Sequence, residues 1–131
     1  MADKLHFSLV SPERQLMSKE VDQVDIPASE GQWGVLPNHS PAMATLAPGI
    51  VRIIDGGETT NILVGGGFAE ITPAGLTVLA EDAVPVAELD AAAITARIET
   101  AEQDMAAEGI APEARRHAEL LIQNLKEIET A

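Results

Sequence analysis

Hydrophobic and polar residues alternate along the first 84 residues, and this period of two predicts β-strands. Leu5, Phe7 and Leu9 alternate with His6 and Ser8, which is the pattern of a strand with one buried face. Turn signals such as Gly56–Gly57 and 73–75 divide the chain at short intervals. Further strands are expected at residues 15–18, 24–26, 49–55, 59–64, 68–72 and 76–80. This spacing predicts a β-sandwich or barrel of short antiparallel strands.

After Pro85 the hydrophobic period becomes helical. Ile94, Ile98, Ala101 and Met105 form one stripe of a first helix. Asp90 or Glu88 can cap its start, Gly109 ends it and Pro112 begins a second helix. The second stripe is Ala114, Ala118, Leu121, Leu125 and Ile128. The expected fold class is therefore α+β, mainly β, with a β domain at 1–84 and an antiparallel two-helix hairpin at 85–131.

The first helix is expected to hold its partners loosely. The residues expected to face them are mostly alanines, at 91, 92, 93, 96 and 101. Alanine favours a helix but buries little area. A loosely held hairpin on a rigid β domain is the kind of element that moves.

The segment from Glu30 to Pro41 is unlike the rest of the chain. It reads E-G-Q-W-G-V-L-P-N-H-S-P and holds two glycines, two prolines and the only tryptophan. Glycine permits backbone angles that a side chain forbids, and proline fixes φ and removes a donor. The segment is therefore a shaped loop or very short strand that presents Trp33 and His39. It is a candidate contact surface, although Trp33 can equally fill the edge of the core.

The net charge of −13 narrows the range of partners. Such an acidic chain is repelled by nucleic acid and by anionic lipid. No apolar run approaches the roughly 18 residues of a membrane span, and the N-terminus has no signal-peptide pattern. The chain has no cysteine, which excludes a thiolate metal site. We expect a cytosolic protein that reaches a membrane only through a protein partner.

No group of residues predicts catalysis. His6, His39 and His117 lie far apart on different elements, and no metal-binding spacing joins them. The run Gly65–Gly67 lacks the lysine and helix of a phosphate loop, and indicates a bulge, a tight corner or a close backbone approach instead. The sequence predicts no catalytic residue, no metal and no cofactor.

Several motifs together resemble a known family. The motif G-Q-W-G-V-L-P-N-H-S-P is followed by L-A-P-G, and G-G-G-F-A-E-I comes about thirty residues after that loop. In this order and spacing, over nearly the whole chain, the sequence resembles the epsilon subunit of the bacterial F-type (rotary) ATP synthase. The resemblance implies an N-terminal β-sandwich and a mobile C-terminal hairpin.

The resemblance also implies partners. It predicts a non-catalytic rotor subunit that contacts the gamma subunit and the c-ring, with the catalytic beta subunits as a further partner. Its place would be the cytoplasmic face of the bacterial inner membrane, as a peripheral component. The contact residues expected are Gly31, Gln32, Trp33, Gly34, Asn38 and His39, and the regulatory residues of the hairpin are Arg97, Arg115 and Arg116.

A second hypothesis is a subunit that senses ATP. Some family members bind ATP through an [IL]-D-x-x-R-A motif, and here Leu89 and Asp90 match while Ala93 replaces the arginine. The missing arginine removes the main charge complement for a phosphate. The first helix has six acids against Arg97, and the second has four against three bases. We therefore predict that the hairpin inhibits ATP hydrolysis weakly or not at all.

Overall fold

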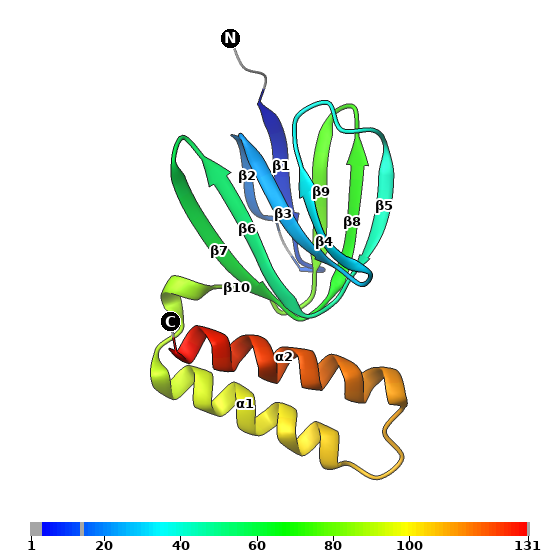
Figure 1. Ribbon diagram of the computed structural model, residues 1–131, viewed down its shortest axis with the longest axis vertical. Helices are drawn as coiled ribbons and strands as arrows, with labels where there is room; N and C mark the ends of the chain where they lie inside the picture. Colours follow the sequence, from blue (N-terminus) through cyan, green and yellow to red (C-terminus); the bar gives the residue numbers. More distant parts are fainter. Residues whose placement is uncertain (1–3, 14, 131) are drawn as a thin grey trace.

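A curled ten-stranded sheet carries two helices across one end (Figure 1). The structure, a computed structural model, describes residues 4–13 and 15–130, and the side chains as far as residue 128. The strands are β1 (Leu5–Val10), β2 (Gln15–Val21), β3 (Gln23–Ala28), β4 (Gly31–Val35), β5 (Ala42–Leu46), β6 (Gly49–Asp55), β7 (Glu58–Val64), β8 (Gly67–Thr72), β9 (Gly75–Ala80) and β10 (Val84–Pro85). A 3-10 turn at Val86–Glu88 leads to α1 (Ala91–Ala106) and α2 (Pro112–Thr130).

The strands form one continuous, curled path with β10 and β2 at its two ends. The order is β10-β7-β6-β3-β5-β8-β9-β1-β2, and β4 pairs with β3 outside this path. Neighbouring strands are antiparallel except β1 and β9, which run parallel with Phe7 opposite Leu76. The expected sandwich of short strands is confirmed, and this one pair departs from the antiparallel pattern. The parallel pair joins the start of the domain to its last long strand.

The core consists of the inward residues of the alternating strands. Phe7 and Leu9 are buried, as the period of two in β1 predicts. The rest of this cluster is aliphatic and comes from every long strand: Leu5, Val21, Val24, Ile26, Val35, Leu46, Val51, Ile53, Ile62, Val64, Ala69, Ile71, Leu76, Val78 and Ala80. The domain therefore fills its interior with branched aliphatic side chains and one phenylalanine.

Two strands lie where the hydrophobic pattern is weak. β4 occupies the segment predicted as a loop or very short strand, and its Trp33 pairs with Ile26 of β3. β5 pairs with β8 over its whole length, from Ala42 to Leu46. Its residues are small or exposed except Leu46, so the sequence shows no clear alternation of buried apolar and exposed polar positions. β4 is fixed by a local hairpin with β3, and β5 by pairing with the distant strand β8.

The helices begin and end close to the predicted residues. The Asp90 side chain caps α1 by accepting a hydrogen bond from the Ala93 N–H at 2.8 Å. Ile94 and Ala101 are its buried residues. The expectation that the alanines face the partners is wrong at positions 91, 92 and 96, which are exposed. On α1 the contact is made by Ile94 and Ile98, together with Ala101.

Leu63 of β7, Ile94 of α1 and Leu125 of α2 are buried together in a second, smaller cluster. Partly buried residues surround them: Ile50, Val84, Val86, Leu89, Ile98, Leu121 and Ile128. We call these residues the apolar seam, because they join the hairpin to the β domain.

Candidate functional site

The six predicted contact residues do not form one loop, because four of them lie at opposite ends of the sheet and two within β4. Gly31 and Gln32 begin β4 beside the β3–β4 turn, at the end that carries the helices (Figure 1). Asn38 and His39 follow β4, in the connection at the opposite end (Figure 1). The single contact loop expected from the sequence is therefore divided by a strand. One flat partner surface cannot cover both ends at once.

Trp33 and Gly34 lie in the middle of β4. Trp33 is half-buried and packs against the edge of the main core. This agrees with the alternative considered above, in which Trp33 fills the edge of the core. Gly34 does not have the positive φ that its motif suggested. A Cβ at Gly34 would lie 3.2 Å from the Asp25 Oδ1 atom. Asp25 is a buried carboxylate that accepts a hydrogen bond from Gln23 at 2.6 Å. A side chain at Gly34 would therefore crowd the Asp25 carboxylate, which would have to shift by a few tenths of an ångström.

Asn38 and His39 form a tight turn with exposed neighbours. Asn38 has a φ of 65°, a left-handed conformation that asparagine tolerates better than most residues. The His39 N–H donates to the Leu36 carbonyl at 3.3 Å. The His39 ring nitrogen Nδ1 lies 2.8 Å from the Ser40 carbonyl, and Leu36 is 53% exposed. The turn therefore presents both polar and apolar side chains to solvent, at the end of the sheet far from the helices.

An exposed apolar strip crosses the outer face of β5, β8 and β9. Its members are Met43, Phe68 and Leu79, which are 70%, 55% and 43% exposed. Phe68 pairs with Leu79 across β8 and β9, and Met43 lies opposite Glu70. Large apolar residues gathered on one exposed face mark an interaction surface. This strip was not predicted from the sequence, although Phe68 occupies the same face as Glu70 in the alternating strand β8.

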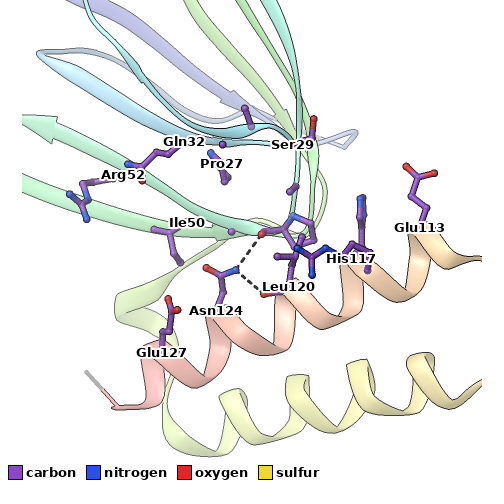
Figure 2. A pocket seen from close by; sticks show the side chains of 16 residues that line it. Pro27, Ser29, Gln32, Ile50, Arg52, Glu113, His117, Leu120, Asn124 and Glu127 are labelled. Atoms are coloured by element: carbon purple, nitrogen blue, oxygen red, sulfur yellow. Dashed lines mark hydrogen bonds between the residues drawn. The ribbon is translucent and has the colours of Figure 1, made fainter.

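A cleft of about 600 Å³ separates α2 from the sheet. Figure 2 shows α2 below it and the strands β3, β4 and β6 above. The Asn124 Nδ2 atom donates to the Pro48 carbonyl at 3.3 Å and to the Leu120 carbonyl at 2.8 Å. Gly31 and Gln32 line the same cleft, together with Arg52, Glu113, Arg116, His117 and Glu127. Because positive and negative side chains alternate there, the cleft does not select an anion.

The three hairpin arginines are not brought together. Arg97 on α1 donates to the Asp82 carboxylate at 2.8 Å. Arg116 on α2 lies 3.6 Å from Glu119, one turn along the same helix, and Arg115 is exposed. Ala93 offers no charge near Asp90, whose carboxylate caps the helix. The described hairpin residues thus contain no cluster of arginines for a triphosphate.

The histidines are also separated. His6 on β1 lies 3.0 Å from the Glu20 carboxylate of β2 and 3.3 Å from the Ser18 hydroxyl, on an exposed face. His117 lines the cleft beside α2. Within residues 4–13 and 15–130, no three His, Asp or Glu side chains are grouped to hold a metal ion.

A salt-bridge network ties the β-strands at the end opposite the helices. Lys4 Nζ lies 2.7 Å from both Asp22 and Asp55. The Gly56 N–H also donates to Asp22 at 2.7 Å. The Lys4 hydrogen bond and then the Gly56 N–H lower the pKa of Asp22, and hydrogen bonds to Asp22 and Asp55 raise the pKa of Lys4. This network stabilises the fold at a turn and forms no reaction centre.

None of the helices in the described part of the chain is both long and apolar enough to cross a membrane.

The β domain matches a known family. The family described as "ATP synthase, Delta/Epsilon chain, beta-sandwich domain" matches residues 4–86. The chain belongs to the ATP synthase delta/epsilon family. The chain is 51% identical to an ATP synthase epsilon chain of Maricaulis maris over 107 residues. The match covers 82% of this chain and 80% of the relative. An epsilon chain of Sinorhizobium medicae is 44% identical over 129 residues, covering 98% and 95%.

Solved structures support the same delta/epsilon fold. A chain in the Euglena gracilis mitochondrial ATP synthase OSCP/F1/c-ring structure has a TM-score of 0.74 and 24% identity, covering 99% of this chain and 82% of that chain. A chain in the Tetrahymena thermophila mitochondrial ATP synthase central stalk/c-ring structure has a TM-score of 0.66 and 11% identity. At these identities the likeness concerns the fold.

Proposed function

We propose that this delta/epsilon chain is a non-catalytic subunit of the central stalk that couples proton flow through the c-ring to ATP synthesis. In this proposal it lies peripherally at the cytoplasmic face of the bacterial inner membrane and binds the gamma subunit. The observation that carries the proposal is the exposed apolar strip on β5, β8 and β9. An acidic protein that leaves Met43, Phe68 and Leu79 exposed has a surface suited to a permanent protein partner.

The strip and the Asn38–His39 turn suit different partners. The strip is broad and lies on the wall of the sheet, so we assign it to the gamma subunit. The turn of Asn38 and His39 lies at the end far from the helices (Figure 1), and we assign it to the c-ring. Gly31 and Gln32 line the cleft between α2 and the sheet. A rotor partner would therefore contact them at the open mouth of this cleft. Trp33 and Gly34 support β4 rather than supply the contact.

The assembly test replaces Phe68 by Asp. A carboxylate at the centre of the strip opposes burial against an apolar partner, so the fraction of subunit retained in the purified ATP synthase should fall at least several-fold. Thr59→Asp adds the same charge at an exposed position on β7 and serves as the matched control. Both variants should keep the melting temperature of the parent. Equal retention of the two variants would remove the strip from the interface.

The second part of the proposal concerns the hairpin. Its acidic first helix gains little from acidic partner surfaces, so we propose that it clips the β domain and inhibits hydrolysis little. Deleting the residues after Val86 should leave the ATP hydrolysis rate of the assembled enzyme within about two-fold of that with the full-length subunit. Such a difference corresponds to a small change in the activation barrier. A rise of several-fold would show that the hairpin acts as a brake.

The alternative function, ATP sensing, has one feature in its favour, namely the Leu89-Asp90 match to the motif. Asp90 is engaged in capping α1, and Ala93 supplies no charge. Calorimetry with ATP and the full-length protein should therefore detect no saturable heat at micromolar ATP. Saturation in that range would favour the sensor.

A further inference from the structure

Four polar side chains meet on the outer face of the neighbouring strands β1 and β2 (Figure 1). His6 lies opposite Glu20 across the two strands, and Ser8 lies opposite Ser18. Residues two apart in a strand share a face, and directly opposed residues are close neighbours. The pairing therefore gathers all four on one face, where His6, Ser18 and Glu20 are exposed and Ser8 is half-buried.

The hydrogen bonds give each His6 ring nitrogen a different role. The Nδ1 atom lies 3.0 Å from the Glu20 carboxylate. An ionised carboxylate only accepts hydrogen bonds, so Nδ1 of the neutral ring carries the hydrogen and Nε2 keeps an acceptor lone pair. The Ser18 and Ser8 hydroxyls lie 3.3 Å and 3.5 Å from Nε2. The closer hydroxyl, that of Ser18, is placed to donate its hydrogen to the ring.

This order of groups is the one that activates a serine. A base that takes the hydroxyl hydrogen makes the oxygen a better nucleophile, and a carboxylate behind the base holds the imidazole in the required tautomer. The base also stands on a well-packed strand, because a Cβ at Gly75 of β9 would overlap the His6 carbonyl. The His6 and Glu20 side chains are 45% and 59% exposed, so water weakens their interaction and the activation should be modest.

We propose that Ser18 is an acylation site for small uncharged thioesters, with His6 as general base and Glu20 as a positioning residue. The Ser18 Oγ atom attacks the thioester carbonyl carbon, so that a C–O bond forms and the C–S bond breaks. His6 Nε2 accepts the hydroxyl proton and passes it to the leaving thiolate. The products are a serine ester and a thiol.

The exposure and charge of the site select the kind of donor. Ser18 is open to solvent, so a small donor can reach its hydroxyl directly. The net charge of −13 repels an anionic donor such as an acyl phosphate, which favours a neutral thioester. The site goes beyond the proposed function, because it requires neither a rotor partner nor the helices.

The test treats the full-length protein with N,S-diacetylcysteamine, a small neutral thioester, and maps the acetyl groups by mass spectrometry of peptides. Neutral hydroxylamine cleaves serine esters and leaves lysine amides intact. Ser18 should be acetylated about ten-fold faster than Ser40, a modest effect for general base catalysis. Ser40 is the matched control, because it is also exposed and the ring of its neighbour His39 contacts its backbone carbonyl.

Two substitutions at His6 test the base. His6→Gln should slow acetylation of Ser18 to about the rate of Ser40, while acetylation of Lys126 on α2, the internal reference, stays unchanged. In His6→Ala, added imidazole should restore part of the Ser18 rate and accelerate Ser40 less. A failure of imidazole to restore the rate would mean that His6 has only a structural role.

The positioning role of Glu20 has a spectroscopic readout. Glu20→Gln should slow acetylation of Ser18 about two- to five-fold, the range for an exposed pair. It should also move hydrogen from Nδ1 towards Nε2 of His6, which the nitrogen-15 chemical shifts of the ring report. Glu58→Gln makes the same change at an exposed position on β7 and should alter neither quantity.

Several outcomes would overturn the proposal. Equal rates at Ser18 and Ser40, or an unchanged Ser18 rate in His6→Gln, would show that the serine is not activated. Acetylation of Ser8 in preference to Ser18 would contradict the choice of nucleophile. A faster reaction with acetyl phosphate than with the thioester, at equal concentration, would contradict the choice of donor.

Discussion

The β domain and the helical hairpin bury their apolar residues in different ways. The main core draws fully buried residues from strands that are distant in the sequence, so each is enclosed on all sides. The hairpin meets the β domain only along a narrow seam, where Ile94 and Leu125 pack against Leu63 of β7. Local stability follows the number of buried apolar contacts. We therefore expect the hairpin to open more easily than the β domain.

The largest effect is expected from the main core. Phe7 is fully buried at the centre of β1. Phe7→Ala should lower the free energy of unfolding by about 3–5 kcal/mol, because it leaves a cavity as well as losing burial. Urea denaturation followed by circular dichroism measures this loss. A cost below about 1 kcal/mol would mean that the core is not closely packed, and would break the comparison.

A smaller and local effect is expected from the apolar seam. Leu125 is also fully buried, but it belongs to the small cluster that joins the hairpin to the β domain. Leu125→Ala should speed amide hydrogen exchange in α1 and α2 by at least ten-fold, and leave exchange in β1 and β9 nearly unchanged. Gln123→Ala is the control on the exposed face. Equal acceleration in the helices and the strands would show that the two regions unfold as one unit.

The β domain is expected to fold without the helical hairpin that follows residue 85. A fragment ending at Val86 keeps β10 and the whole region matched by the family, but exposes Leu63. It should retain a β-type circular dichroism spectrum and a cooperative melt, with a melting temperature lowered by several degrees, since about 1 kcal/mol shifts it by 4–8 °C in a domain of this size. A disordered fragment would contradict the proposal that the β domain folds alone.

The smallest effect concerns pH. The pKa of Asp22 is lowered in the folded state by Lys4 and the Gly56 N–H. Its contribution to stability is therefore present above its unfolded pKa of about 3.9, and is lost as the pH falls through the lower folded value. Between about pH 5 and pH 2 the melting temperature of the parent should fall slightly more steeply than that of Asp22→Asn. Parallel curves would mean that the network adds nothing.

The sequence predicted features that depend on neighbours along the chain. The alternation around Phe7 marks a buried strand, and Asp90 caps α1 because its side chain reaches an amide three residues on. The run Gly65–Gly67 predicts a bulge, a tight corner or a close backbone approach, and the last of these is present, because a Cβ at Gly67 would overlap the Leu79 carbonyl. Each of these conclusions needs only local geometry.

Features that depend on which strands pair were missed or misplaced. The parallel pairing of β1 with β9 joins segments that share no turn. The separation of Gln32 from Asn38 appears only when β4 is known to be a strand, and its pairing with β3 decides that. The exposed strip of Met43, Phe68 and Leu79 is visible only once β5, β8 and β9 are side by side. Tertiary pairing fixes all three, and periodicity does not encode it.

The parallel pairing of β1 with β9 also determines when, during synthesis of the chain, the sheet can be completed. Residues 7–10 find their partner strand only when residues 76–79 have been made. Until then both edges of the β1–β2 hairpin are unpaired, and unpaired edges recruit other strands. Pairings this distant in sequence slow folding, since the loop must close before the contact is gained. The domain should thus complete its core late, and the growing chain should be most prone to aggregation before β9 emerges.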